Sequence, residues 1–143
     1  DALHPPRHSD CHGPAMKFIM SLAILLAAAM PAFASDARFL ASLSKLDPQT
    51  RLEQVCDLRA MKQIARDSNP YHPDRAKTDV VSHPRHSGNT VTGTGGAFRS
   101  GGRWYQFSFS CTGTPDGMKV TAFSYRLGQP IPESKWASYG LWR

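Results

Sequence analysis

Histidines are the residues of this chain whose spacing could support metal chemistry. Three of them lie in one stretch rich in Pro, His and Asp, which runs from Asn69 to Asn89: His72, His83 and His86. Zinc sites usually take three or four protein ligands, and Asp74 and Asp79 could complete such a set. The same composition is typical of an exposed loop. We therefore expect no metal or other cofactor, and keep a metal-dependent hydrolase built on these histidines as an alternative hypothesis.

Other patterns of catalytic residues are absent from the sequence. No Gly-x-Ser-x-Gly motif marks a nucleophilic serine, and Ser108 and Ser110 lie in an expected strand with no histidine opposite them. Glu53 and Asp57 share one turn of an expected helix, where we interpret them as a surface charge and a cap rather than as a glycosidase pair. The glycines of Gly93–Gly96 lie inside an expected strand, where glycine usually marks a bulge or a close contact. The sequence therefore favours a protein without catalytic activity.

The cysteines predict a disulfide. In "WYQFSFSC", residues 104–111, aromatic and small polar residues alternate as in a strand, and Cys111 falls on the aromatic side. Cys56 lies on the apolar stripe of an expected helix, so a helix laid over the aromatic face would bring the two sulfur atoms together. Such a bond would close a loop of about 55 residues and stabilise the fold by roughly 4 kcal/mol. Two free buried cysteines are the alternative, which would be expected in a cytosolic chain.

The N-terminal residues predict export. Residues 1–15 have no apolar periodicity and are interpreted as an upstream or non-native leader. Residues 16–34 begin with Met-Lys, continue with an apolar run and end in Ala-Phe-Ala, as a secretory signal peptide does before its cleavage site. The apolar run is shorter than the ~20 residues of a membrane span. We therefore expect one periplasmic or secreted domain over residues 35–143, with no membrane span after cleavage.

Helices are expected in the first half of this domain. Asp47 followed by Pro48 is a strong start signal, because aspartate caps the first turn and proline fits the first helical position. The apolar residues that follow, as far as Arg66, scatter around a single helix axis. They form a clean stripe only if the helix is divided near Asp57. We therefore predict two helical segments with a kink or break at Asp57.

The second half predicts an antiparallel meander of three strands. A Gly-Gly turn pairs Ser100 with Arg103, and a Pro-Asp-Gly turn pairs Thr114 with Met118. Both registers put the large apolar residues on one face, and a slip of one residue in either hairpin would scatter them. A further short strand is predicted around Thr78–Ser82.

The C-terminal residues are expected to dock on the domain. Pro132 can open a short helix that ends at Gly140, and Leu141 can then fold back on Trp136. Together these elements predict an α+β fold, with helices packed on one face of a small antiparallel β-meander and one disulfide.

The face of the meander that points away from the aromatic residues is a candidate ligand-binding face. The predicted registers place Arg99 opposite Trp104 and Gln106 opposite Arg126, with small side chains around them. A tryptophan beside cationic and amide groups could bind a sugar or a carboxylate by stacking and hydrogen bonding. The alternative is a solvated face on which Arg99 and Trp104 form a stabilising cross-strand pair.

The net charge of the chain, +6 at pH 7, favours anionic partners. Nucleic acid is not expected, because the basic residues are scattered and no recognition motif is present. We therefore predict a non-catalytic binding or interaction module for an anionic envelope polymer or an envelope protein. An inhibitor or accessory factor of an envelope enzyme, with contacts from the Asn69–Asn89 loop or the turn tips, is the alternative.

Three segments carry a resemblance to a known family, in matching order and spacing: LDPQTRLEQVCDLRAMKQI, GGAFRSGGRWYQFSFSCTGTPDGMKV and IPESKWASYGLW. With them the chain resembles the alphaproteobacterial family called domain of unknown function 930. The resemblance implies a small exported bacterial protein with a paired-cysteine domain. It implies no activity, because the family has no assigned chemistry. The stretch Asn69–Asn89 matches least well, so its features can be peculiar to this chain.

Overall fold

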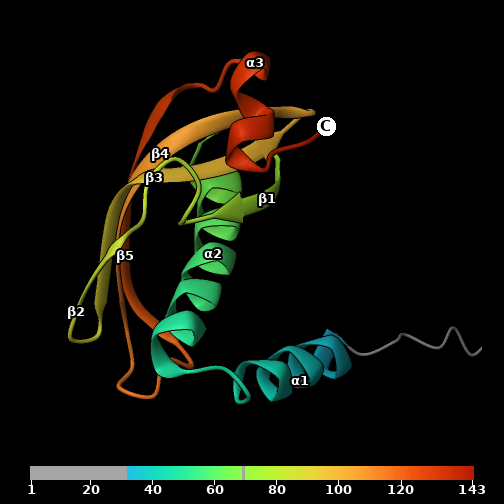
Figure 1. The fold of residues 1–143 in the computed structure, drawn as a ribbon. Coiled ribbons are helices and arrows are strands. Elements are labelled where there is room, and N and C mark those ends of the chain that lie inside the picture. The colour runs from blue at the N-terminus through green and yellow to red at the C-terminus, as the bar shows by residue number, and fades with distance from the viewer. Residues whose placement is uncertain (1–31, 69) are drawn as a thin grey trace, which may run out of the picture. The chain divides into compact units, whose positions relative to one another are not determined.

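The computed structural model describes residues 32–68 and 70–143. The predicted leader at 1–15 and most of the predicted signal peptide at 16–34 lie outside these residues. The elements follow one another in this order (Figure 1): α1 (Ala32–Leu43), α2 (Pro48–Asp67), β1 (Pro73–Lys77), β2 (Arg85–Ser87), β3 (Thr90–Ser100), β4 (Arg103–Gly113), β5 (Val120–Pro130), α3 (Glu133–Trp136) and the 3₁₀ helix η1 (Ala137–Tyr139). The α+β class predicted from the sequence is confirmed.

The sheet has five antiparallel strands rather than the three of the predicted meander. Its order is β1-β3-β4-β5, and β2 also pairs with β3. The two extra strands come from the Asn69–Asn89 stretch and share one edge of β3, where β1 pairs near Ser100 and β2 pairs near Thr90. The strand predicted at Thr78–Ser82 is wrong, because those residues form the connection that crosses the gap between β1 and β2.

Helix α2 is continuous, so the break predicted at Asp57 is wrong. Asp47 caps the helix as expected and accepts hydrogen bonds from the backbone N–H groups of Gln49 and Thr50. The carboxylate of Asp57 does not cap a second segment of its own helix; it accepts a hydrogen bond from the backbone N–H of Thr78 instead. The residues that α2 buries form one stripe at helical spacing: Leu52, Val55, Cys56, Ala60 and Ile64.

The predicted β3–β4 register is confirmed, with Ser100 opposite Arg103 and Arg99 opposite Trp104. The β4–β5 register is wrong by two residues, since Arg126 lies opposite Ser108 and not opposite Gln106. One residue of the shift comes from the turn, where the N–H of Thr114 bonds to the carbonyl of Lys119 rather than pairing with Met118. The other comes from a bulge, because the pairing shifts between Thr112 and Gly113. A shift of two keeps every side chain on its predicted face.

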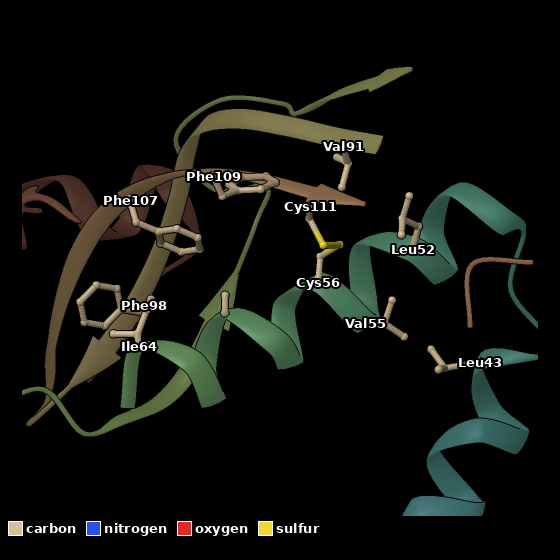
Figure 2. Close-up of a cluster of buried hydrophobic side chains, with 11 residues drawn as sticks. Leu43, Leu52, Val55, Cys56, Ile64, Val91, Phe98, Phe107, Phe109 and Cys111 are labelled. Atoms are coloured by element: carbon tan, nitrogen blue, oxygen red, sulfur yellow. A yellow bond between two sulfur atoms is a disulfide. The ribbon is translucent and has the colours of Figure 1, made fainter. Parts of the chain in front are cut away.

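The main core lies between α2 and the aromatic face of the sheet (Figure 2). Phe98, Phe107 and Ile64 are fully buried there. Cys56 of α2 and Cys111 of β4 form a disulfide at its centre, which confirms the predicted bond. The helix is thereby fixed to the middle of the sheet by a covalent bond as well as by packing.

A second, smaller core covers one end of the opposite face. Successive residues of a strand point to opposite faces, so Trp104 points away from the main core that holds its neighbour Tyr105. Trp104 is buried there with residues of the C-terminal segment: Ile131, Trp136 and Leu141. Gly140, with a left-handed φ of 67°, ends the 3₁₀ helix η1, and the N–H of Leu141 then donates to the carbonyl of Trp136. The predicted docking of the C-terminus is confirmed.

Candidate functional site

The face of the sheet opposite α2 carries a row of hydroxyl groups beside the second core. Thr92 of β3 pairs with Ser110 of β4, and Ser110 pairs with Ser124 of β5. Paired residues of neighbouring strands point to the same face, so these three side chains form one line across the sheet. Ser108 and Arg126 form the next pair along the strands. We call Thr92, Ser108, Ser110 and Ser124 the hydroxyl face.

The connection between β1 and β2 is held beside this face by the bulge in β3. The pairing of β3 with β4 shifts between Gly93 and Gly96, and the carbonyl of Gly95 accepts the backbone N–H groups of both Val80 and Val81. Gly95 has no room for a side chain, because a Cβ there would collide with the backbone of Ser82. The close approach brings Ser82 and the residues after it to the edge of the hydroxyl face.

Together the sheet and this connection form a cavity of about 810 Å³. Its lining is dominated by hydroxyl-bearing and cationic side chains: Ser82, His83, Arg85, Thr92, Gly93, Thr94, Ser108, Phe109, Ser110, Ser124, Tyr125 and Arg126. None of these lining residues is Asp or Glu. The cavity can therefore offer hydrogen bonds and positive charge to a ligand without a carboxylate opposing an anion.

The cations of the cavity are available to a ligand. Arg85 and Arg126 are exposed, and within the described part of the chain neither forms an ion pair. His83 is more restricted, because its Nδ1 lies 2.9 Å from a carboxylate oxygen of Asp79. The hydrogen bond to Asp79 and its charge raise the pKa of His83. Near neutral pH this favours the protonated, cationic imidazole at the rim of the cavity.

Of the four residues predicted to form a binding face, only Arg126 lines the cavity. Trp104 is fully buried, and its indole N–H donates to the carbonyl of Trp142 at 2.7 Å. Arg99 forms a two-fold hydrogen-bonded ion pair with Asp74, and its guanidinium lies over the rings of both tryptophans. The C-terminal segment thus already covers the surface of Trp104 on which a ligand was expected to stack.

Gln106 also has a different neighbour from the one predicted. It lies opposite Ala97 of β3, and its side-chain amide donates to the carbonyl of Thr94 at 2.8 Å. Its amide therefore supports the bulge in β3 rather than forming a pair with Arg126. The shift of two residues in the β4–β5 register is the cause.

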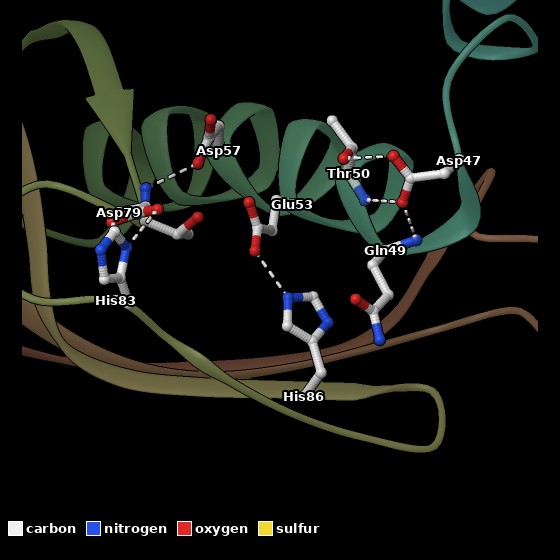
Figure 3. Close-up of polar contacts among 9 residues, drawn as sticks. Asp47, Gln49, Thr50, Glu53, Asp57, Asp79, His83 and His86 are labelled. Atoms are coloured by element: carbon white, nitrogen blue, oxygen red, sulfur yellow. Dashed lines mark hydrogen bonds and ion pairs between the residues drawn. The ribbon is translucent and has the colours of Figure 1, made fainter.

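The three loop histidines are not brought together. His83 bonds to Asp79, whereas Nε2 of His86 lies 2.6 Å from Oε1 of Glu53 on α2 (Figure 3). The backbone of His72 bonds to Ser100 near the far end of β3. Within residues 32–68 and 70–143, no group of three His, Cys, Asp or Glu side chains is arranged to hold a metal ion.

Several residues of the cavity were not anticipated from the sequence. Ser108 and Ser110 were placed on the correct face, and the predicted register set Ser124 opposite Ser108, whereas the structure sets it opposite Ser110. Ser82 comes from a connection whose course depends on Gly95, and Arg85 comes from the short strand β2 that follows it. The glycine-rich stretch Gly93–Gly96 was the available signal, since it was expected to mark a bulge or a close contact.

A family model described as Domain of Unknown Function (DUF930) matches residues 43–141. The chain belongs to this family. The DUF930 match extends from the last residue of α1 to the docked C-terminal segment, so it contains every residue of the cavity. Neither a curated protein nor a solved structure matches the chain.

Among the described residues, no helix is long and apolar enough to cross a membrane.

Proposed function

We propose that this DUF930 domain is a non-catalytic binding module of the bacterial envelope, and that its hydroxyl-lined cavity holds an anionic ligand. The observation that carries the proposal is the lining of the cavity, which combines a row of hydroxyl groups with two arginines that form no ion pair among the described residues, and which contains no Asp or Glu. Arginine forms strong, often two-fold hydrogen bonds with carboxylates and phosphates. Serine and threonine hydroxyls can both donate and accept hydrogen bonds.

An acidic polysaccharide of the envelope is the ligand class that this lining fits best. Such a polymer offers carboxylates for Arg85 and Arg126 and hydroxyl groups for the row Thr92, Ser110 and Ser124. The net charge of +6 supports attraction of a polyanion over longer distances. The predicted signal peptide at 16–34 supports a location in which such a polymer is met.

Binding of polygalacturonate, a carboxylated glycan, tests the proposal, with neutral dextran as the comparison. Wild-type protein should bind polygalacturonate and not dextran at low ionic strength. The R85Q/R126Q variant should bind at least about tenfold more weakly, because two charge-assisted hydrogen bonds are lost. Isothermal titration calorimetry or biolayer interferometry would measure the difference.

The matched control is the R38Q/R103Q variant, which removes two exposed arginines that do not line the cavity. It has the same net charge as R85Q/R126Q, so a general loss of electrostatic attraction would weaken both variants equally. Equal affinities of the two variants would contradict the assignment of the cavity as the binding site.

A further inference from the structure

The segment Thr78–His86 consists of the connection after β1 and the first two residues of β2, and it is attached to α2 at both of its ends (Figure 3). At its start, the buried Thr78 donates its backbone N–H to Oδ1 of Asp57 at 2.7 Å. At its end, Nε2 of His86 lies 2.6 Å from Oε1 of Glu53. Glu53 and Asp57 are four residues apart and therefore lie on the same side of α2, one turn from each other.

Between these two ends, three residues of the segment Thr78–His86 line the cavity: Ser82, His83 and Arg85, the first residue of β2. The middle of the segment is held to the sheet by the N–H groups of Val80 and Val81 on the carbonyl of Gly95. The position of the cavity wall therefore depends on the two carboxylates of α2, on the carbonyl of Gly95 and on the pairing of β2 with β3, in which Arg85 lies opposite Thr92. Neither Glu53 nor Asp57 lines the cavity.

We propose that Asp57 and Glu53 are positioning residues that clamp the segment Thr78–His86 over the edge of the sheet, and that the carboxyl group of Asp57 makes this clamp pH-dependent. The clamp holds Ser82, His83 and Arg85 in place at the cavity. The consequence for ligand binding rests on the function proposed above, whereas the clamp is a property of the unliganded protein.

The charges around Asp57 set the direction of the effect. Burial raises the pKa of Asp57 to about 7, against the hydrogen bonds from Thr78 and the charge of Lys77 at the end of β1, which lower it. The negative charge of Glu53 raises the pKa further. Opening the segment would expose Asp57 to water and return its pKa toward the ordinary value, so the protonated carboxyl favours the closed segment.

The second contact adds a further attachment to α2. Glu53 and His86 are both partly buried, and their side chains are hydrogen-bonded to each other. Nδ1 of His86 is buried and has no hydrogen-bond partner among the described residues, so Glu53 is the side chain that holds this ring. Within the segment, His83 pairs with Asp79, and the negative charge of Glu53 also raises the pKa of His83 slightly further. Because the protonated carboxyl of Asp57 favours the closed segment, acid should close the cavity wall and alkali should loosen it.

Amide hydrogen exchange of Val80 and Val81 in the unliganded protein tests the clamp directly. After correction for the intrinsic rate, the protection of these two amides should fall at least about tenfold between pH 5 and pH 7 and then level off, since the open form releases a proton that the closed form retains. In the D57N variant the amide oxygen of asparagine can still accept the N–H of Thr78, but the side chain does not titrate. Its protection should therefore be constant over the same range.

The matched control is D67N, which changes an exposed aspartate of the same helix and should follow the wild-type profile. Wild-type protection that does not change between pH 5 and pH 7 would overturn the proposal, as would the same pH dependence in D57N. The exchange measurement needs no ligand. If the exchange shows the expected pH dependence but polygalacturonate does not bind, the clamp is supported and the proposed function is contradicted. If polygalacturonate binds but the exchange is independent of pH, the proposed function is supported and the clamp is contradicted.

Discussion

Asp57 shows how one residue can be misinterpreted from the sequence and still be informative. Its type and position in the helix predicted a cap, and the structure does use its carboxylate to accept a backbone N–H. The N–H belongs to Thr78, 21 residues further along the chain, and no local pattern specifies that partner. A site that raises the pKa of a carboxyl group to about 7 disfavours the carboxylate, so ionisation of Asp57 costs this small domain stability at alkaline pH.

The stability of the D57N variant should reveal this cost. Because the pKa of Asp57 is raised in the folded protein, its contribution to the free energy of unfolding is fully present below about pH 4 and is lost as the pH rises to about 7. The D57N variant lacks this loss, so it should be more stable than wild type at pH 8, by up to about 4 kcal/mol. The two proteins should have similar stabilities at pH 4.

Urea denaturation at both pH values would measure the difference, with D67N as the control for loss of an exposed carboxylate on the same helix. Equal unfolding free energies of D57N and wild type at pH 8 would show that ionisation of Asp57 does not destabilise the folded protein.

For the strands, the sequence predicted which face of the sheet each side chain occupies more reliably than which residue lies opposite it on the neighbouring strand. The alternation of aromatic and small residues in β4 determines which side chains enter the core, and the structure agrees for Phe107, Phe109 and Cys111. The partner of each residue depended on the β4–β5 turn, in which Asp116 accepts hydrogen bonds from Thr114 and Met118 and so widens the loop. Hydrophobic patterning cannot detect a shift of two residues, because it preserves the faces.

The helical pattern failed at α2 for a related reason. Leu58 and Met61 are only partly buried and lie outside the stripe that packs on the sheet. Counted as core residues, they made the apolar pattern of a single helix look scattered. Division at Asp57 made the pattern look regular, whereas the structure tolerates these residues at the sides of one straight stripe. Neither β1 nor β2 was predicted, since short strands rich in charged residues carry little periodic signal.

Gly95 allows a test at the level of these elements. The G95A variant would place a methyl group against the backbone of Ser82, so the segment after β1 must move away from β3. We expect a loss of stability of roughly 1–3 kcal/mol, as for overpacking elsewhere, together with loss of exchange protection at Val80 and Val81. Hydrogen exchange and urea denaturation would measure both effects.

The control for this variant is T94A, which alters the neighbouring residue and adds no atoms against the segment. Unchanged protection of Val80 and Val81 in G95A would mean that the segment is not held by its contact with the bulge.

For the whole domain, the disulfide should supply much of the net stability. The bond between Cys56 and Cys111 closes a loop with a sequence separation of 55 residues. Replacing both cysteines by serine should lower the free energy of unfolding by roughly 4 kcal/mol, because the unfolded chain is no longer restrained. That loss is comparable with the total stability of many small domains.

Denaturation of the C56S/C111S variant and of wild-type protein in reductant would measure this contribution, and the two samples should agree. If the variant kept the midpoint of the oxidised protein, packing of α2 would be shown to hold the fold without the bond.

The position of the disulfide within α2 also concerns the clamp. Cys56 lies three residues after Glu53 and directly before Asp57, so the covalent bond to β4 sets the rotation and the longitudinal position of the helical turn that carries both carboxylates. A thiol–disulfide change at this one bond would shift both attachment points of the Thr78–His86 segment together. Binding at the proposed site would then depend on the redox state of the compartment. In a reducing compartment the chain would keep the arginines and hydroxyl groups of the cavity but lose the fixed spacing between them.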